Sequence, residues 1–228
     1  MKRLLHYFTP GEWILWGSSV ILIVVSFLLF GRGDPLTLIA SLIGVTSLIF
    51  NAKGNPFGQI LMIVFSVFYG VISFALAYYG EMITYLGMTA PMSLIALISW
   101  LRNPFEGRRE EVRVNRISHK EVCFAFVLTG AVTVAFYFIL SALNTAKLLP
   151  STLSVATSFF AVYLTFRRSP WFALAYAAND LVLIVLWVLA SFHDSSNISV
   201  TVCFILFLIN DVYGFISWLK MEKRQKGL

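Results

Sequence analysis

Two apolar stretches of the chain each carry an asparagine followed by an aspartate near their middle. The pairs are Asn179-Asp180 and Asn210-Asp211. A carboxylate in the middle of an apolar membrane span costs about 2.5–3.5 kcal/mol on insertion scales, so it normally faces protein groups or a water-filled space. The two pairs therefore predict a polar cavity inside a bundle of membrane helices, with these four side chains as candidate substrate-binding groups.

The depth of the two aspartates favours one shared cavity. Asp180 lies nine residues after Trp171, and Asp211 lies eight residues before Leu219. At the rise of an α-helix these separations are about 13 and 12 Å, so antiparallel helices would bring both carboxyl groups to a similar height. Two plainer interpretations stay open. The asparagines could bond neighbouring helices, which is usually worth about 0.6 kcal/mol, and the aspartates could be protonated and structural.

Tyr176, Trp187, Tyr213 and Gln59 are further candidates for the same cavity. Tyr176 precedes the first aspartate by one helical turn and Trp187 follows it by two turns, so both share its face. Trp187 would also suit the aromatic belt at a membrane interface. Tyr213 closely follows the second aspartate. Gln59 stands just inside an expected helix start, where it either helps packing or offers an amide to a ligand.

The types of these side chains indicate what the cavity would bind. Carboxylates and amides suit hydroxyl groups, and aromatic rings suit a flat, preferably cationic, heterocycle. No Lys or Arg lies in the middle of an apolar stretch, so nothing there would neutralise a phosphate. We therefore expect a neutral or cationic small solute with a ring, and we expect neither a cofactor nor a metal.

Composition identifies the class of protein. The chain has 228 residues, of which 59% are hydrophobic and only 12% charged, and its mean hydropathy is +0.83. Soluble domains are about 25% charged, so the sequence predicts an all-α polytopic membrane protein. We expect eight transmembrane helices, at Trp13–Phe30, Leu36–Phe50, Phe57–Tyr79, Met82–Leu101, Val122–Ala142, Pro150–Phe166, Trp171–Phe192 and Ile198–Leu219.

The distribution of basic residues predicts the orientation. With eight spans both termini lie on one side, and that side would hold fifteen Lys and Arg residues against two, Arg32 and Lys147, on the other. The positive-inside rule then makes both termini cytoplasmic. The same split accounts for the net charge of +6 through contact with anionic lipid, without a nucleic-acid partner.

A weak internal repeat divides the chain. Asn55-Pro56-Phe57 and Ser169-Pro170-Trp171 each open a long span, and Trp100-Leu101-Arg102 matches Trp218-Leu219-Lys220, with proline-to-tryptophan separations of 44 and 48 residues. Both units begin on the same side, so the repeats are parallel. We expect an extra N-terminal helix in residues 1–35, a three-helix repeat in 36–101, a basic loop and linker helix in 102–149, a second three-helix repeat in 150–219 and a basic tail in 220–228.

One span contains an expected break. Pro91 stands in the middle of Met82–Leu101 and removes a backbone hydrogen bond to the Gly87 carbonyl, which predicts a kink and a candidate moving part.

Several motifs, in order along the chain, resemble the PnuC family of bacterial vitamin transporters over roughly Leu36–Lys220. The motifs are Asn51-Ala52-Lys53-Gly54-Asn55, Tyr79-Gly80-Glu81, Trp100-Leu101-Arg102 and the two Asn-Asp spans. The resemblance implies nicotinamide riboside as substrate, imported down its gradient and trapped by cytoplasmic phosphorylation. It also implies a location in the bacterial inner membrane, a three-plus-one-plus-three helix plan similar to SWEET proteins, and a homotrimer. It assigns Asn179, Asp180, Asn210, Asp211 and Tyr213 to the pocket, with Gln59 and Trp187 beside them.

Three alternatives remain at this point. Thiamine or riboflavin could be the substrate on the same scaffold, and an ion gradient could drive a symporter through either aspartate. A protein of another class, an intramembrane enzyme with the two aspartates as an acid–base pair, would instead change its substrate chemically.

Overall fold

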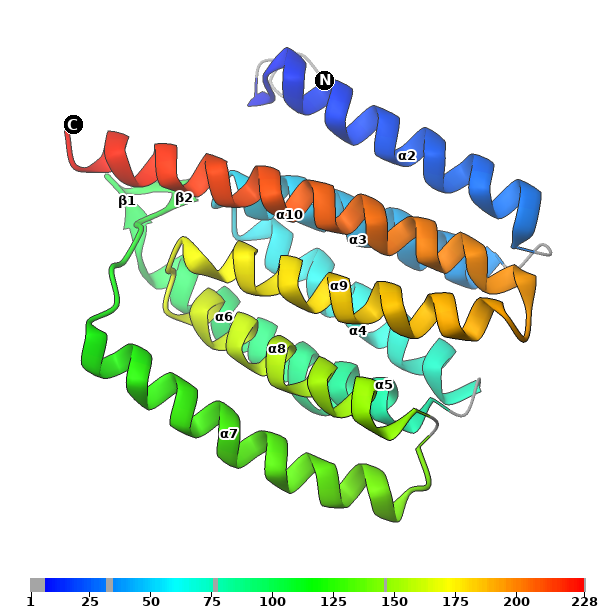
Figure 1. The fold of residues 1–228 in the computed structure, drawn as a ribbon. Coiled ribbons are helices and arrows are strands. Elements are labelled where there is room, and N and C mark those ends of the chain that lie inside the picture. Colours follow the sequence, from blue (N-terminus) through cyan, green and yellow to red (C-terminus); the bar gives the residue numbers. More distant parts are fainter. Residues whose placement is uncertain (1–6, 32–34, 76–77, 146, 228) are drawn as a thin grey trace.

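The computed structural model describes residues 7–31, 35–75, 78–145 and 147–227, and these form a helical bundle (Figure 1). Eight helical segments are long and apolar enough to cross a membrane, which confirms the predicted number. The helices are α2 (Pro10–Phe30), α3 (Pro35–Ala52), α4 (Phe57–Ala75), α5 (Tyr79–Ile83), the π-helix η1 (Thr84–Thr89), α6 (Ala90–Arg102), α7 (His119–Ala142), α8 (Leu148–Phe166), α9 (Trp171–Ser191), the 3-10 helix η2 (Ser195–Asn197) and α10 (Ile198–Gln225).

Helix α10 extends beyond its expected end. It continues through the residues predicted as a separate basic tail as far as Gln225, and Lys223 and Arg224 lie in its last turn. Cations suit that position because the helix macrodipole is negative at its C-terminus. The start of α2, the end of α10 and the β-hairpin described below lie toward the same end of the bundle (Figure 1).

The span that contains Pro91 is interrupted where the sequence predicts. The π-helix η1 ends one residue before α6 begins, and the backbone N–H of Ala90 donates to the carbonyl of Tyr85, five residues earlier. A proline near the start of α6 cannot donate a backbone hydrogen bond, and the wider π-helical turn accommodates this loss. The span is therefore built from three segments, α5, η1 and α6.

A small β-hairpin follows α6, which the all-α prediction missed. Strands β1 (Pro104–Phe105) and β2 (Arg108–Val112) pair antiparallel. The two residues between them, Glu106 and Gly107, have φ of 50° and 75°. Positive φ at both central positions is what a tight two-residue hairpin loop requires. The Val112 N–H donates to the Gly54 carbonyl at 2.9 Å, which fixes the hairpin against the α3–α4 turn.

Six helical segments form a closed ring of neighbours. Around the ring, α3 packs against α4, α4 against α6, α6 against α8, α8 against α9, α9 against α10, and α10 against α3. Helix α2 packs on α3 and α10, and α7 packs on α8. These two helices lie at opposite edges of the bundle (Figure 1). The interior of the ring is the place where a polar cavity can be enclosed by protein.

Candidate functional site

The two aspartates meet inside the ring. Asp180 on α9 is 4% exposed and Asp211 on the neighbouring α10 is 5% exposed. Both side chains line one small cavity between the helices. The second oxygen of Asp180, Oδ2, has no hydrogen-bond partner among the described residues.

A small cavity of about 30 Å³ adjoins this pair. It has room for water but not for a nucleoside, because binding pockets for small molecules usually measure about 300–1,000 Å³. None of the described residues that line it is a Lys or Arg. The lining comes from α3, α4, η1, α8, α9 and α10: Leu48, Met62, Phe65, Tyr85, Thr89, Ser158, Tyr176, Asn179, Asp180, Phe204, Phe207 and Asp211.

Asn179 lines the cavity and also bonds α9 to α8. Its side-chain oxygen accepts from Thr157 at 2.8 Å, from Ser158 at 2.9 Å and from Ser154 at 3.4 Å. These bonds fix the orientation of the amide. Its nitrogen has no hydrogen-bond partner in the described part of the chain, so it remains a donor for a ligand.

The structure places Asn210 and Tyr213 away from the cavity, toward α2. The Asn210 amide donates to the Ser19 hydroxyl at 3.0 Å and to the Leu206 carbonyl at 2.8 Å. The Tyr213 hydroxyl donates to the buried Glu12 carboxylate at 2.9 Å. Successive helical residues are about 100° apart, so an α10 that directs its aspartate to the centre turns these two side chains outward.

Gln59 and Trp187 also lie outside the cavity lining. The Gln59 amide donates to the Asn51 side-chain oxygen at 2.9 Å and so joins α4 to α3. The Trp187 N–H donates to the Tyr69 hydroxyl at 2.7 Å. Trp187 lines a second cavity, about 90 Å³ in volume, at the end of the bundle away from the hairpin.

Aromatic rings close the central cavity on two sides. Toward the second cavity, the ring centroids of Tyr69 and Tyr85 lie 4.4 Å apart, and the Tyr69 ring also contacts Trp187. Toward the hairpin end, the Trp218 ring lies 4.9 Å from Phe172 and 5.4 Å from the Trp100 ring. Tyr176 lines the cavity next to this second group. The structure therefore has a closed conformation.

The buried carboxyl group of Glu81 was not among the predicted site residues. Glu81 on α5 is 1% exposed, and neither carboxyl oxygen has a hydrogen-bond partner among the described residues. In the sequence, Glu81 was singled out only as part of the motif Tyr79-Gly80-Glu81. An acidic residue at the start of an apolar run is the signal that could have found it.

Comparison with known proteins identifies the family. Residues 34–220 match the family described as nicotinamide mononucleotide transporter. The chain belongs to this family. It is 24% identical over 203 residues to the nicotinamide riboside transporter PnuC of Neisseria mucosa, with 87% of this chain and 77% of that protein covered. A crystal structure of the vitamin B3 transporter PnuC superposes with a TM-score of 0.84 at 21% identity, covering 96% of this chain and 94% of the other.

Membership of the PnuC family is thus confirmed, and the fold is that of PnuC. The relatives are transporters. The chain is accordingly a multi-pass membrane transporter and not an enzyme, and the interpretation of the two aspartates as a catalytic pair is wrong.

Proposed function

We propose that this transporter takes up nicotinamide riboside through the central cavity by facilitated diffusion, with cytoplasmic phosphorylation removing the product and sustaining the flow. Support comes from the relative in Neisseria mucosa, which is named for this substrate. The observation that carries the proposal is the buried pair of Asp180 and Asp211 at a cavity with aromatic walls and no Lys or Arg among its described lining residues. A pyridinium ring suits carboxyl groups and aromatic faces, and ribose hydroxyls suit carboxyl and amide groups.

Within this proposal, four of the predicted side chains contact the substrate: Asp180, Asp211, Asn179 and Tyr176. Their support is that all four line the cavity. We propose that Asn210, Tyr213, Gln59 and Trp187 act instead on the positions of the helices. Each of these four donates a hydrogen bond to a partner outside the cavity.

Transport by this route needs the aromatic groups on either side of the cavity to separate in turn. The cavity must enlarge from about 30 Å³ to hold a nucleoside. The π-helix η1 supplies both Tyr85 and Thr89 to the cavity wall and interrupts the regular helical hydrogen bonds of its span. Breaks of this kind often occur at functional sites, so we assign the moving wall to the segment from η1 to Pro91.

We further propose the three-plus-one-plus-three plan, with parallel repeats at α3–α6 and α8–α10, α7 as linker and α2 as the additional helix. Equivalent contacts support it. Trp100 of α6 donates to the Thr165 carbonyl of α8 at 2.9 Å, and Trp218 of α10 donates to the Asn51 carbonyl of α3 at 2.7 Å. In each case the acceptor is the second-last residue of the first helix in a repeat.

The turns after these acceptors also correspond. Gly54 and Arg168 both have positive φ, of 66° and 57°. Their carbonyl groups accept hydrogen bonds from two residues of one connecting segment, Val112 and Asn115. The two turns thus hold the same segment by equivalent backbone bonds, as a two-fold relation between the repeats requires.

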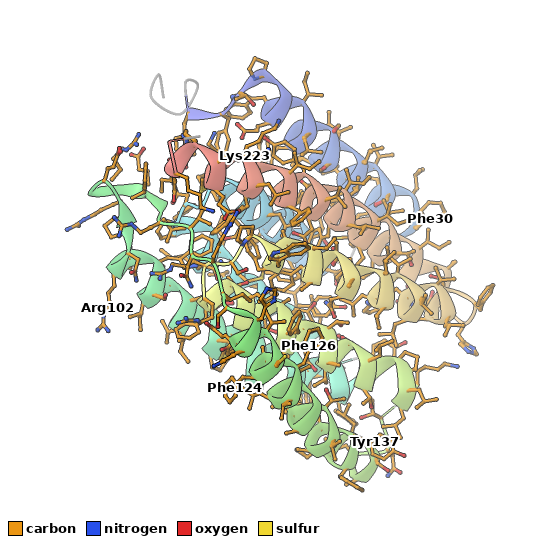
Figure 2. All side chains as sticks on the ribbon, turned by 60° about the vertical axis from the view of Figure 1, so that its left-hand side comes forward. Phe30, Arg102, Phe124, Phe126, Tyr137 and Lys223 are labelled. Atoms are coloured by element: carbon orange, nitrogen blue, oxygen red, sulfur yellow. The ribbon has the colours of Figure 1, made fainter. Side chains whose placement is uncertain are left out.

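The location and assembly follow from the same reasoning. We propose that the protein lies in the bacterial inner membrane with both termini cytoplasmic, because the basic residues concentrate at the end that carries the hairpin. We also propose the homotrimer that the family resemblance implies. Helix α7 offers a large apolar surface to lipid or to a neighbouring copy, with Phe124, Phe126 and Tyr137 along it (Figure 2).

Reconstituted vesicles test the transport proposal. Labelled nicotinamide riboside should enter without a proton or sodium gradient, and an ionophore should not stop it. Asp211→Asn should reduce uptake, whereas Glu106→Gln, which alters an exposed carboxylate on the hairpin, should not. Uptake that collapses with the proton gradient would indicate a symporter that uses the aspartate pair. Uptake of labelled thiamine or riboflavin, without uptake of the riboside, would contradict the substrate assignment.

A further inference from the structure

A second polar pocket lies at the end of the bundle that carries the hairpin. Its volume is about 380 Å³, within the range of small-molecule sites. Segments far apart in the sequence converge on it: the residue Tyr7 before α2, the α3–α4 turn, strand β2 and the last turns of α10. Four cationic side chains line it, Lys53, Arg108, Lys220 and Arg224.

Two of these cations are available to a ligand. Lys220 forms no ion pair among the described residues. Arg108 pairs with Glu106 at 2.8 Å, but both side chains are more than half exposed. Exposed pairs of this kind contribute about 0–1 kcal/mol, so a stronger anion displaces them readily.

The other two cations are already paired and support the shape of the pocket. Lys53 contacts the buried Glu12 at 3.1 Å, and Arg224 contacts Glu111 at 2.6 Å. Burial raises the pKa of the Tyr7 hydroxyl to about 12, so this group stays neutral at physiological pH and does not repel an anion. The pocket therefore presents Lys220, which has no ion pair among the described residues, and Arg108, which is held only by an exposed pair.

We propose that this pocket binds a phosphate monoester of nucleotide size. The lining holds four cationic and two acidic side chains, an excess of two positive charges. A phosphate monoester carries a charge of about −1.5 to −2 near neutral pH, which matches this excess better than the single charge of a phospholipid diester does. The acidic residues Glu110 and Glu111 line the same pocket and can accept hydrogen bonds from sugar hydroxyls. The central cavity has no such cations in its described lining, so the two sites differ in the ligand that they select.

The proposed transport must move the ring group that contains Trp218 of α10, and a ligand in this pocket would hold that end of α10 against the α3–α4 turn. The pocket touches α10 at Met221 and the α3–α4 turn at Lys53, and α10 is bonded to α3 close by, through Trp218 and Asn51. A ligand that bridges them stabilises the closed arrangement. This consequence rests on the proposed function: with the pocket on the cytoplasmic side, a phosphorylated nucleoside made from the imported riboside would slow further uptake.

Calorimetry on the purified protein in detergent tests the binding step. The probes are nicotinamide mononucleotide and AMP, each compared with its nucleoside, which lacks the phosphate. We expect both nucleotides to bind, to weaken as salt rises, and to lose about tenfold or more in affinity in Lys220→Gln and in Arg108→Gln, since each loses a charge-assisted hydrogen bond. Lys223→Gln is the matched control, because it removes the same charge from an exposed site on the same helix outside the pocket.

The outcomes separate this proposal from the transport proposal. Asp211→Asn should lower riboside uptake and leave nucleotide binding unchanged. If riboside uptake is not observed but the nucleotides bind, the transport proposal fails and the proposal for this pocket stands. Equal nucleotide affinity in all variants, or no binding of either nucleotide, would overturn the proposal. A further outcome would overturn it too. If the detergent-purified protein bound neither nucleotide, and Lys220→Gln and Arg108→Gln only weakened its association with phosphatidylglycerol in nanodiscs, the ligand would be a lipid headgroup.

Discussion

Gly44→Ala should distort the central cavity by displacing an aromatic ring that lines it. A Cβ atom at Gly44 on α3 would lie 2.3 Å from Cζ of Phe207 and 3.1 Å from Cδ2 of Phe65. Both rings line the cavity. Carbon atoms pack at about 3.5–4.0 Å, so the Phe207 ring must move by roughly 1.2 Å or more. Because Phe207 borders the cavity, we expect its ring to shift into that space.

The expected size of the effect comes from two opposing contributions. An added methyl group that forces such a shift typically costs about 1–3 kcal/mol. Replacing glycine by alanine inside a helix gains up to about 1 kcal/mol. With the full gain, the net expectation for Gly44→Ala is a loss of up to about 2 kcal/mol. Gly214→Ala on α10 is the matched control, because its Cβ would meet only Ala173 at 3.6 Å and Ala52 at 3.7 Å, which are ordinary contacts.

Thermal unfolding of the purified variants, followed by riboside uptake in vesicles, measures both consequences. Gly44→Ala should lower Tm by several degrees and reduce uptake, since about 1 kcal/mol corresponds to 2–4 °C for a chain of this size. Gly214→Ala should keep or slightly raise Tm and retain uptake. If the two variants behave alike, the packing of Phe207 against α3 is not as described, and the argument that the cavity wall controls transport fails.

Three further changes test other contacts. Asp180→Ala should weaken riboside binding by about 1–3 kcal/mol through a lost hydrogen bond, measured by calorimetry, and normal affinity in a folded variant would remove this residue from the site. Asn210→Ala should leave riboside affinity unchanged but lower Tm slightly, because the amide bonds Ser19 of α2 and such interhelical bonds are worth about 0.6 kcal/mol; a large loss of affinity would return this residue to the cavity. Trp218→Phe should lower the free energy of unfolding by about 1–3 kcal/mol, since the Asn51 carbonyl loses its buried donor; an unchanged Tm would contradict that estimate.

The sequence predicts the helices well because the membrane imposes strong rules on composition. Eight apolar runs indicated membrane spans, two of them short, and all eight are helical, with the two short ones extended as α3 and α8. The break near Pro91 was also predictable, since proline lacks the backbone donor. Its form as a π-helix was not, because a proline predicts the lost donor but not which carbonyl the neighbouring N–H groups then reach. The hairpin after α6 was missed because Glu106, rather than a second glycine, occupies one of its positive-φ positions.

The candidate site shows the limit of reading polar residues from a sequence. An asparagine beside an aspartate signals burial for both, but neighbouring helical residues point about 100° apart, so one cavity seldom receives both. On α9 the cavity extends far enough toward α8 to reach Asn179 as well as Asp180. On α10 the corresponding direction is filled by α2, and Asn210 bonds that helix instead. The difference between the two pairs lies in which helix stands beside each, and that is fixed by tertiary packing rather than by either local motif.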